Sequence, residues 1–234
     1  KLYSVLPADG VGDFTFSRNS AATRINKDGL IETVAVGKSR LNYPLIDGVV
    51  NGCPSHLLEP ERLQKIQYSE DFSNAAWIKG GLTVNANQAI SPDGTLNADL
   101  IQVTVNSGNI YDNVSGSGDG SFSVFAKYID IKYIRLRSTG SYAYFDIENG
   151  TVGNTLNVLD TKIENYGNGW YRCTVIGNNT NSLVQVFASN TDVGQPTGLG
   201  SVYIFGAQLE QGSYPTSYIP NYGTSAGITR VAET

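Results

Sequence analysis

From about residue 67 onward, the sequence consists of short runs in which apolar and polar residues alternate, separated by Gly, Asn and Asp turns. The clearest runs are LTVNANQAI, ADLIQVTV, SFSVFAKYI, YIRLRST, YAYFDIENGTV, WYRCTVIG, LVQVFAS and VYIFGAQLE. Alternation of this kind places every second side chain on one face of a β-strand. Many short, evenly spaced strands without intervening long helices are typical of a sandwich rather than an α/β fold. The sequence therefore predicts an all-β, jelly-roll β-sandwich of two antiparallel sheets.

The composition agrees with such a fold and argues against several partners. Only 16% of the 234 residues are charged, while 26 are Gly and 14 are Tyr, which suits strands joined by tight turns. The net charge is −5 and no basic run occurs, so we expect no nucleic-acid partner. No apolar stretch approaches the ~20 residues of a membrane-spanning helix, so we expect no membrane partner. An acidic surface rich in Tyr and Asn favours neutral, hydroxyl-rich ligands over phosphates.

The first 65 residues are less regular than the rest. DFTFSRNS alternates and predicts a strand with Phe14 and Phe16 on one face, and TRINKDGLIETV predicts a hairpin. Asp47-Gly48 has the composition of a tight turn, and Asn149-Gly150 predicts a type I′ hairpin. The expected organisation has three parts: an N-terminal extended or hairpin segment (1–65), the jelly-roll sandwich (66–220), and a C-terminal tail or linker (221–234).

Alternation also assigns side chains to the two faces of each strand. Ile134 and Leu136 are predicted to face the core, so the arginines that follow each of them face outward. The same reasoning for the neighbouring strands completes one outward-facing set: Arg135, Arg137, Tyr142, Tyr144, Asp146 and Gln185. Tyrosine rings stack on the apolar faces of sugars, while Arg, Asp and Gln hold hydroxyl groups. We therefore predict a carbohydrate-binding face, with ordinary cross-strand Tyr–Arg pairing as the alternative interpretation.

The sequence offers few residues for catalysis, and we predict no catalytic residue. His56 is the only histidine, and a lone histidine in a loop-like stretch next to Cys53 is a weak basis for a nucleophilic dyad. Paired carboxylates for glycoside hydrolysis stay an alternative because 21 acidic residues are present. Two cysteines are too few to indicate a disulfide scaffold or a zinc site, and the sequence leaves open whether Cys53 and Cys173 pair.

Five stretches between Phe14 and Arg230 are informative together: FTFSRNSAATRINKDGLIE, LLEPERLQKIQYSEDFSNAAW, SPDGTLNADLI, GWYRCTV and FGAQLEQGSYPTSYIPNYGTSAGITR. They resemble modules of bacteriophage tail and head-spike fibre proteins, and also concanavalin-like and family 4-type carbohydrate-binding jelly rolls. The resemblance implies a jelly roll with a glycan-binding role and an extracellular or virion-surface location. It also implies that the partners are a polysaccharide or cell-surface glycan and the other domains of a larger fibre or modular protein.

The resemblance further implies a structural calcium ion between the first and last strands. Asp71 in SEDFS and Glu210 in AQLEQ are the matching carboxylates, with backbone carbonyls completing the oxygen shell. The competing interpretation is that Gln208 and Glu210 hydrogen-bond buried backbone near the N-terminal segment. Trp77 and Trp170 occupy recurrent positions of such modules, and we expect both to serve packing rather than to form sugar platforms.

The expected function is non-catalytic binding of a polysaccharide or cell-surface glycan by a module of phage-fibre or viral origin. One alternative is a structural virion decoration or oligomerisation module without a ligand, which buried tyrosines and the lack of an exposed aromatic strip would favour. The other is a concanavalin-like sandwich glycoside hydrolase or lyase. A concave cleft holding two carboxylates about 5–10 Å apart would favour the hydrolase.

Overall fold

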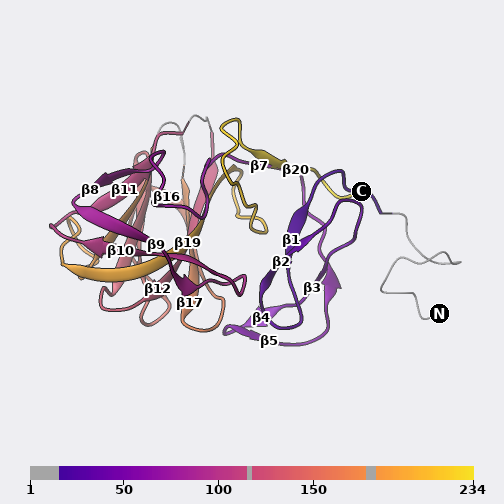
Figure 1. Ribbon diagram of the computed structural model, residues 1–234, viewed down its shortest axis with the longest axis horizontal. Coiled ribbons are helices and arrows are strands. Elements are labelled where there is room, and N and C mark those ends of the chain that lie inside the picture. Colours follow the sequence, from indigo (N-terminus) through magenta and orange to yellow (C-terminus); the bar gives the residue numbers. More distant parts are fainter. Residues whose placement is uncertain (1–15, 115–117, 178–182) are drawn as a thin grey trace, which may run out of the picture.

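The computed structural model describes residues 16–114, 118–177 and 183–234 (Figure 1). Within these ranges the chain forms twenty strands and no α-helix. It follows that the described ranges hold no helix with the length and apolar character needed to cross a membrane.

Two six-stranded antiparallel sheets form the body of the molecule. The first sheet contains, in spatial order, β16 (Val158–Asn165), β17 (Trp170–Gly177), β12 (Gly120–Tyr128), β19 (Gly200–Gln211), β10 (Leu96–Val103) and β9 (Leu82–Ile90). The second sheet contains β15 (Thr151–Leu156), β14 (Ser141–Asp146), β13 (Tyr133–Ser138), β18 (Val184–Ser189), β11 (Asn109–Asp112) and β8 (Ile78–Gly80).

Chain order and spatial order differ in the way that defines a jelly roll. Successive strands from β10 to β13 alternate between the two sheets, and so do β17, β18 and β19: β17 and β19 belong to the first sheet and β18 to the second. As a result, β19 pairs with both β10 and β12 in the first sheet. In the same way, β18 pairs with both β11 and β13 in the second sheet. The predicted all-β jelly-roll sandwich is confirmed.

The main hydrophobic core lies between the two sheets. Phe122 of β12, Ile134 and Leu136 of β13, and Phe145 of β14 are fully buried in one cluster. The alternation of apolar residues in these strands therefore points their apolar faces inward, as predicted. Cys173 of β17 belongs to the same cluster.

The two cysteines do not form a disulfide. Cys173 is buried in the core, whereas Cys53 is exposed, and both are free thiols. Burial raises the pKa of the Cys173 thiol well above its usual value, so this thiol is inert at neutral pH.

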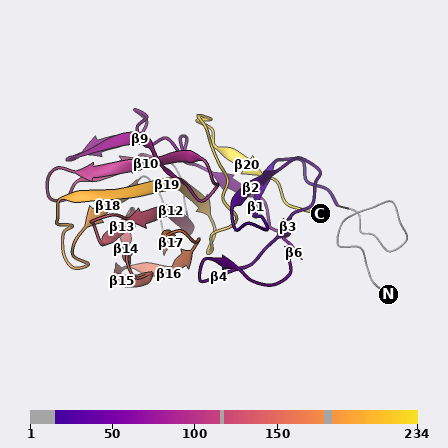
Figure 2. The same ribbon diagram turned by 60° about the horizontal axis from the view of Figure 1, so that its bottom comes forward.

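The N-terminal segment lies beside the sandwich (Figure 2), and its hairpin packs against side chains of the first sheet. Its hairpin of β1 (Ala22–Ile25) and β2 (Ile31–Val34) confirms the hairpin predicted from TRINKDGLIETV. Ile31 joins Phe125, Trp170 and Phe205 in a second hydrophobic cluster. The remaining strands of the segment are short: β3 (Leu41–Asn42), β4 (Leu45–Ile46), β5 (Val49–Val50), β6 (Ser55–His56) and β7 (Arg62–Gln64).

Two turn predictions have different outcomes. Asp47 and Gly48 join β4 to β5 with φ values of 49° and 78°, which are those of a tight two-residue hairpin turn. The type I′ prediction for Asn149-Gly150 is wrong, because four residues join β14 to β15 and only Gly150 has a positive φ. The carboxylate of Asp146 accepts hydrogen bonds from the backbone of residues 148 and 149 and thereby stabilises the longer loop.

The strand predicted from DFTFSRNS does not form where the structure describes it. Phe14 lies outside the described residues, and residues 16–20 have no strand pairing. The backbone of Ser17 instead exchanges two hydrogen bonds of 2.7 and 3.1 Å with Thr234. The end of the chain therefore lies against the start of the described region.

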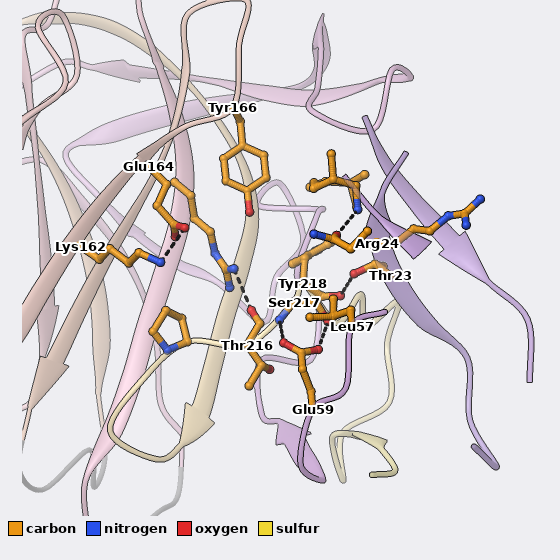
Figure 3. A pocket seen from close by; sticks show the side chains of 15 residues that line it. Thr23, Arg24, Leu57, Glu59, Lys162, Glu164, Tyr166, Thr216, Ser217 and Tyr218 are labelled. Carbon is orange, nitrogen blue, oxygen red and sulfur yellow. Dashed lines mark hydrogen bonds and ion pairs between the residues drawn. The ribbon is translucent and has the colours of Figure 1, made fainter. Parts of the chain in front are cut away.

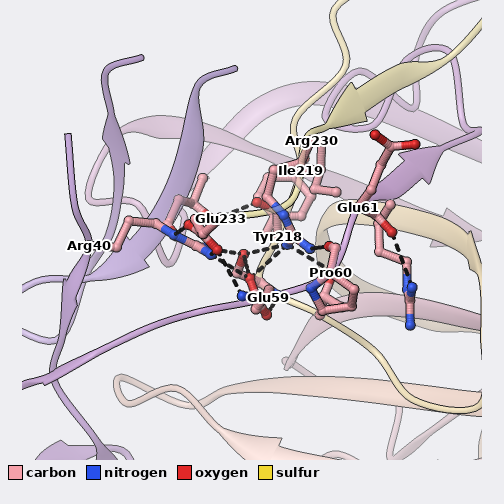
Figure 4. Close-up of polar contacts among 12 residues, drawn as sticks. Arg40, Glu59, Pro60, Glu61, Tyr218, Ile219, Arg230 and Glu233 are labelled. Atoms are coloured by element: carbon pink, nitrogen blue, oxygen red, sulfur yellow. Dashed lines mark hydrogen bonds and ion pairs between the residues drawn. The ribbon is translucent and has the colours of Figure 1, made fainter. Parts of the chain in front are cut away.

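A buried ionic network joins the N-terminal segment to the last residues (Figure 4). Glu233 accepts from Arg40 Nη2 at 2.7 Å and from Arg18 Nη1 at 3.1 Å, and all three side chains are inaccessible to solvent. Glu59 pairs with Arg40 at 2.9 Å and with Arg230 at 2.7 Å. Arg230 belongs to β20 (Ile228–Arg230), which pairs with β7. Residues 228–234 are thus held by the N-terminal segment. The boundaries expected at 65/66 and 220/221 stay predictions.

Candidate functional site: the outer face of the second sheet

The outer face of the second sheet carries the side chains that alternation assigned to it. Its centre is a buried guanidinium: Arg135 is 5% exposed, and its Cζ lies 4.0 Å from the ring centre of Phe187. The rings of Tyr142 and Tyr144 lie 5.1 and 5.6 Å away. Tyr144 is fully buried and donates its hydroxyl to the carbonyl of Gly194 at 2.9 Å. Arg135 and Tyr144 therefore belong to the interior of this face.

Next to this buried centre, one row of side chains crosses the whole sheet at the surface. Direct strand pairing joins its six members in order: Leu156, Tyr142, Arg137, Gln185, Tyr111 and Ile78. Each member is half-buried or exposed. With about 4.8 Å between neighbouring strands, the row spans about 24 Å. We refer to these six residues as the cross-sheet row.

Hydrogen bonds fix the polar part of the cross-sheet row. Arg137 Nη1 donates to Gln185 Oε1 at 3.0 Å, and Gln185 Nε2 donates to Asn109 Oδ1 at 3.3 Å. Arg137 Nε also donates to the carbonyl of Thr139 at 2.9 Å. Tyr142 stands edge-on to Tyr144, with ring centres 5.8 Å apart. The polar centre of the row is therefore positioned in advance, and an aromatic ring flanks it on each side.

The structure separates the six predicted binding residues into three groups. Arg137, Tyr142 and Gln185 lie in the cross-sheet row, and Arg135 and Tyr144 lie beneath the surface next to it. Asp146 shares the face but lies opposite Tyr133, two positions beyond Tyr144. Their roles in binding stay predictions.

Asp146 has structural partners of its own. It caps the β14–β15 loop and pairs with Lys132 at 3.2 Å. Burial favours the neutral acid, but hydrogen bonds from Asn149 and the charge of Lys132 hold the pKa of Asp146 below its usual value. Its charge is therefore used within the protein.

Sequence reasoning missed Tyr111, Asn109 and Phe187. Tyr111 and Asn109 belong to β11, which has only four residues, NIYD, and gives little alternation to detect. Phe187 follows Gln185 by two positions in LVQVFAS, so period two alone places both on the same face. The signal for Phe187 was therefore present in the sequence.

Glu210 is satisfied by protein donors. Its carboxylate accepts from the backbone N–H and the hydroxyl of Thr216, both at 2.6 Å, and from Gln208 Nε2 at 2.8 Å. Gln208 Oε1 in turn accepts from the backbone of Ile219 at 2.7 Å. The two side chains therefore bind the segment that follows β19, in agreement with the backbone-bonding interpretation, although the bonded segment is C-terminal rather than N-terminal.

Asp71 takes part in a separate network, in which it accepts from the hydroxyl of Ser73 at 2.6 Å and from the backbone of Asn74 at 3.0 Å. In the part of the chain that the structure describes, no three His, Cys, Asp or Glu side chains are grouped to hold a metal ion. Glu210 is surrounded by hydrogen-bond donors, and the Arg62 guanidinium lies 3.7 Å from it. This environment suits a carboxylate that is paired within the protein better than one that binds calcium. A calcium ion held by Asp71 and Glu210 stays a prediction.

A second polar site is a cavity of about 500 Å³ beside β9 and β10, lined by Tyr68, Tyr222 and three acids. Burial raises the pKa of Glu70 to about 7 and that of Asp99 to about 6. Asp71 is the third acid. This cavity is lined by different residues from those of the cross-sheet row.

A third cavity, of about 190 Å³, lies where the N-terminal segment meets β16 and β17 (Figure 3). Lys162 and Glu164 form an ion pair of 2.7 Å at its wall. On the other side, Glu59 accepts from the backbone and hydroxyl of Ser217 at 2.8 and 2.6 Å. Because these charged groups are already paired, we assign this cavity to the packing of the segment on the sandwich.

The fold and the sheet face define the chain as a jelly-roll sandwich with a polar and aromatic surface row. No protein-family model matches the sequence, and no curated protein matches it. Among solved structures, it is similar to the CBM22-1–GH10 modules of xylanase 10B from Clostridium thermocellum, with 15% identity and a TM-score of 0.39. That match covers 68% of this chain and 30% of the xylanase chain.

Two further solved structures have similar scores. The family 30 carbohydrate-binding module of a Clostridium thermocellum cellulosomal cellulase is 9% identical over 65% of this chain and 99% of that chain, with a TM-score of 0.37. The enzymatically active domain of tailspike protein 4 from bacteriophage CBA120 is 13% identical over 63% of this chain and 21% of that chain, with a TM-score of 0.37. At these TM-scores the similarities assign neither a family nor a ligand.

Proposed function

We propose that this protein is a non-catalytic carbohydrate-binding module that holds an extended polysaccharide or cell-surface glycan along the cross-sheet row. The observation that carries the proposal is the order of side chains in that row, in which Tyr142 and Tyr111 flank Arg137 and Gln185. Rings stack on the apolar faces of sugar rings, while the fork of Arg and the amide of Gln bind hydroxyl groups. The resemblance of the sequence to phage-fibre and carbohydrate-binding modules agrees with this role.

The two outer faces of the sandwich differ in availability. Ile31 of the N-terminal hairpin packs against Phe125 and Phe205 of the first sheet. The second sheet exposes Leu156 and Ile78, which are 45% and 41% accessible, at the two ends of the row. A ligand that crosses the second sheet therefore meets apolar surface at both ends and polar groups in the middle. Affinity should be modest, because bound hydroxyl groups lose their hydration.

The test is affinity electrophoresis in gels that contain soluble plant and microbial polysaccharides, followed by calorimetry on each polysaccharide that retards the protein. Tyr142→Ala and Tyr111→Ala are each expected to weaken binding about tenfold through loss of ring stacking. Tyr128→Ala, at an exposed position on β12 of the other sheet, is the matched control and should bind like the unchanged protein. Absence of retardation by every polysaccharide, with folded protein, would contradict the proposal and favour a structural virion module.

One observation favours glycoside hydrolysis as a second candidate function. The cavity beside β9 and β10 holds Glu70, whose pKa of about 7 suits a general acid, next to Asp71 and Asp99. Incubation with each bound polysaccharide and measurement of new reducing ends distinguishes the two functions. Release of reducing ends that Glu70→Gln abolishes would establish hydrolysis; no release would leave binding alone.

A further inference from the structure

The charge on the candidate binding face differs from that of the whole chain. The chain has a net charge of −5, which favours neutral ligands, yet two arginines lie side by side on this face, at Arg135 and Arg137. Five other arginines form ion pairs with carboxylates: Arg18, Arg24, Arg40, Arg62 and Arg230. Arg135 and Arg137 form none with any described residue. The face therefore holds positive charge without an internal counter-ion.

Arg135 supplies a buried part of this charge. Its Nη1 donates a long hydrogen bond of 3.4 Å to the Tyr144 hydroxyl, and its buried Nε has no hydrogen-bond partner in the part of the chain that the structure describes. The surrounding rings compensate the cation in place of a carboxylate. Burial lowers the pKa of Arg135, but a guanidinium stays protonated at neutral pH. The positive potential of Arg135 thus acts on the adjacent row.

Arg137 is the accessible cation of the pair. Its two hydrogen bonds go to neutral oxygens, at Thr139 and Gln185, and use two of the five N–H donors of a guanidinium. The other three donors have no hydrogen-bond partner among the described residues and can bind a ligand. A planar guanidinium fork matches a carboxylate, which accepts two parallel hydrogen bonds.

The acids on this side of the sheet lie away from Arg137. Asp146 is opposite Tyr133, four residues along β13 from Arg137, or about 13 Å, and pairs with Lys132. Asp192 lies near Gly153 and Tyr144, outside the row. Neither of them neutralises the centre of the cross-sheet row.

We propose that the ligand of the cross-sheet row is an acidic glycan, a polysaccharide whose sugar rings carry carboxylates, and that Arg137 pairs with one of them. The proposal rests on the proposed function, because it specifies the ligand class for the same face. The rings of Tyr142 and Tyr111 stack on sugar rings on either side of Arg137. Arg137 forms an ion pair with the carboxylate of the uronic acid between them. Arg135 acts as a positioning residue, because its charge and its ring contacts support Tyr142 from below.

The test compares polysaccharides of one backbone in two charge states. Polygalacturonate, alginate and hyaluronan are each titrated calorimetrically beside their carboxyl-reduced forms, at low and high salt. We expect at least one acidic polymer to bind about ten- to a hundredfold more tightly than its reduced form, as a charge-assisted contact provides. The preference should shrink in high salt. Arg137→Gln should abolish it, and Arg137→Lys should retain part of it.

Matched variants separate this inference from the proposed function. Arg24→Gln removes an arginine from a half-exposed ion pair elsewhere and should leave the preference unchanged. Equal binding of acidic and reduced polymers, still dependent on Tyr142, would overturn the acidic ligand and keep the binding module. Binding that Arg137→Gln leaves unchanged would also overturn the inference. Failure of folded protein to bind any polymer in either form would overturn both proposals.

Discussion

At the scale of single residues, exposure decides which of two neighbouring tyrosines can meet a ligand. Tyr142 and Tyr144 lie two positions apart on β14 and share a face, yet only Tyr144 is fully buried. The difference arises because the carbonyl of Gly194, in the segment that follows β18, accepts the Tyr144 hydroxyl. One of these side chains therefore serves folding, and the other is available to a sugar.

Substitution of the two tyrosines should separate these roles. Tyr144→Ala is expected to lower the free energy of unfolding by about 3–5 kcal/mol because it leaves a cavity under Arg135. Tyr144→Phe, which removes only the buried hydroxyl, should cost about 1 kcal/mol. Tyr142→Ala should change stability by less than Tyr144→Ala. Urea unfolding of the three variants checks this order, and equal losses for both alanine variants would contradict it.

Glu70 should make stability depend on pH. Burial raises its pKa from 4.5 to about 7 in the folded chain, so the folded state binds more protons than the unfolded state between these values. Stability is therefore expected to fall as pH rises from about 4.5 to about 7, and Glu70→Gln should flatten that slope. Burial also raises the pKa of Asp99 and that of Asp112 from 3.8 to about 6, so both add a slope of the same sign between these values, and Glu70→Gln should reduce the slope without removing it.

The measurement is urea unfolding at a series of pH values. Glu61→Gln, at an exposed position, serves as the control and should keep the slope of the unchanged protein. A slope that Glu70→Gln does not alter would show that Glu70 ionises at its ordinary pKa.

At the scale of elements, the sequence predicted long, alternating strands well and short or polar ones badly. β9 and β17 coincide with the runs LTVNANQAI and WYRCTVIG. β8, β11 and β16 were not predicted, because the first two have three and four residues and β16 is largely polar at the sheet edge. Half of the cross-sheet row was missed for this reason: Tyr111 and Ile78 lie on the short strands, and Leu156 follows a loop that was read as a tight turn.

Other features cannot be read from alternation at all. Period two assigns a face but not its accessibility, so the burial of Tyr144 and Arg135 depends on a segment distant in sequence. The same limit applies to Trp77 and Trp170, which are both 2% exposed, as the packing interpretation expected. Pairing between strands far apart in the chain, such as β10 with β19, follows from the whole jelly roll.

Two glycines provide an element-scale test of how the N-terminal segment docks. Gly48 and Gly37 both have positive φ, 78° and 70°, so alanine strains the backbone at either position. A Cβ on Gly48 would lie 2.6 Å from the backbone nitrogen of Gly167, whereas one on Gly37 would meet nothing within 4 Å. Gly37→Ala is expected to cost about 1–2 kcal/mol, and Gly48→Ala about 1–3 kcal/mol more.

Thermal unfolding measures this difference, and limited proteolysis reports whether the segment has separated from the sandwich. Gly48→Ala should expose the N-terminal segment to protease before the sandwich is cut. Equal unfolding temperatures and equal protease sensitivity of the two variants would mean that the β4–β5 turn does not pack closely against the connection between β16 and β17.

At the scale of the whole molecule, the buried ionic network makes the first and last parts of the chain depend on one another. Glu233 pairs with both Arg18 and Arg40 without access to solvent, and Glu59 is the second partner of Arg40. Loss of one partner of a buried pair leaves an uncompensated charge. The last residues are therefore expected to be required for the stability of the N-terminal segment, although about 200 positions separate them in sequence from the hairpin.

Glu233→Ala is expected to destabilise the fold by about 3–5 kcal/mol, because the buried guanidinium of Arg18 loses its counter-ion and Arg40 keeps only its pair with Glu59. Glu32→Ala, which removes a half-exposed pair with Arg24, should cost less than about 1 kcal/mol. Chemical unfolding of both variants at neutral pH gives the comparison. A small loss for Glu233→Ala, similar to that for Glu32→Ala, would show that the network is not a determinant of stability.

The backbone pairing of Ser17 with Thr234 has a practical consequence. Ser17 and Thr234 lie side by side at the surface, so a segment cut at these two positions has both of its ends in one place. Units of this kind tolerate transfer into the surface loops of a host scaffold, because the two host ends need not move apart. Grafting residues 17–234 into several loops of one oligomer would display many copies of the same sheet face, and avidity would then compensate for weak individual contacts.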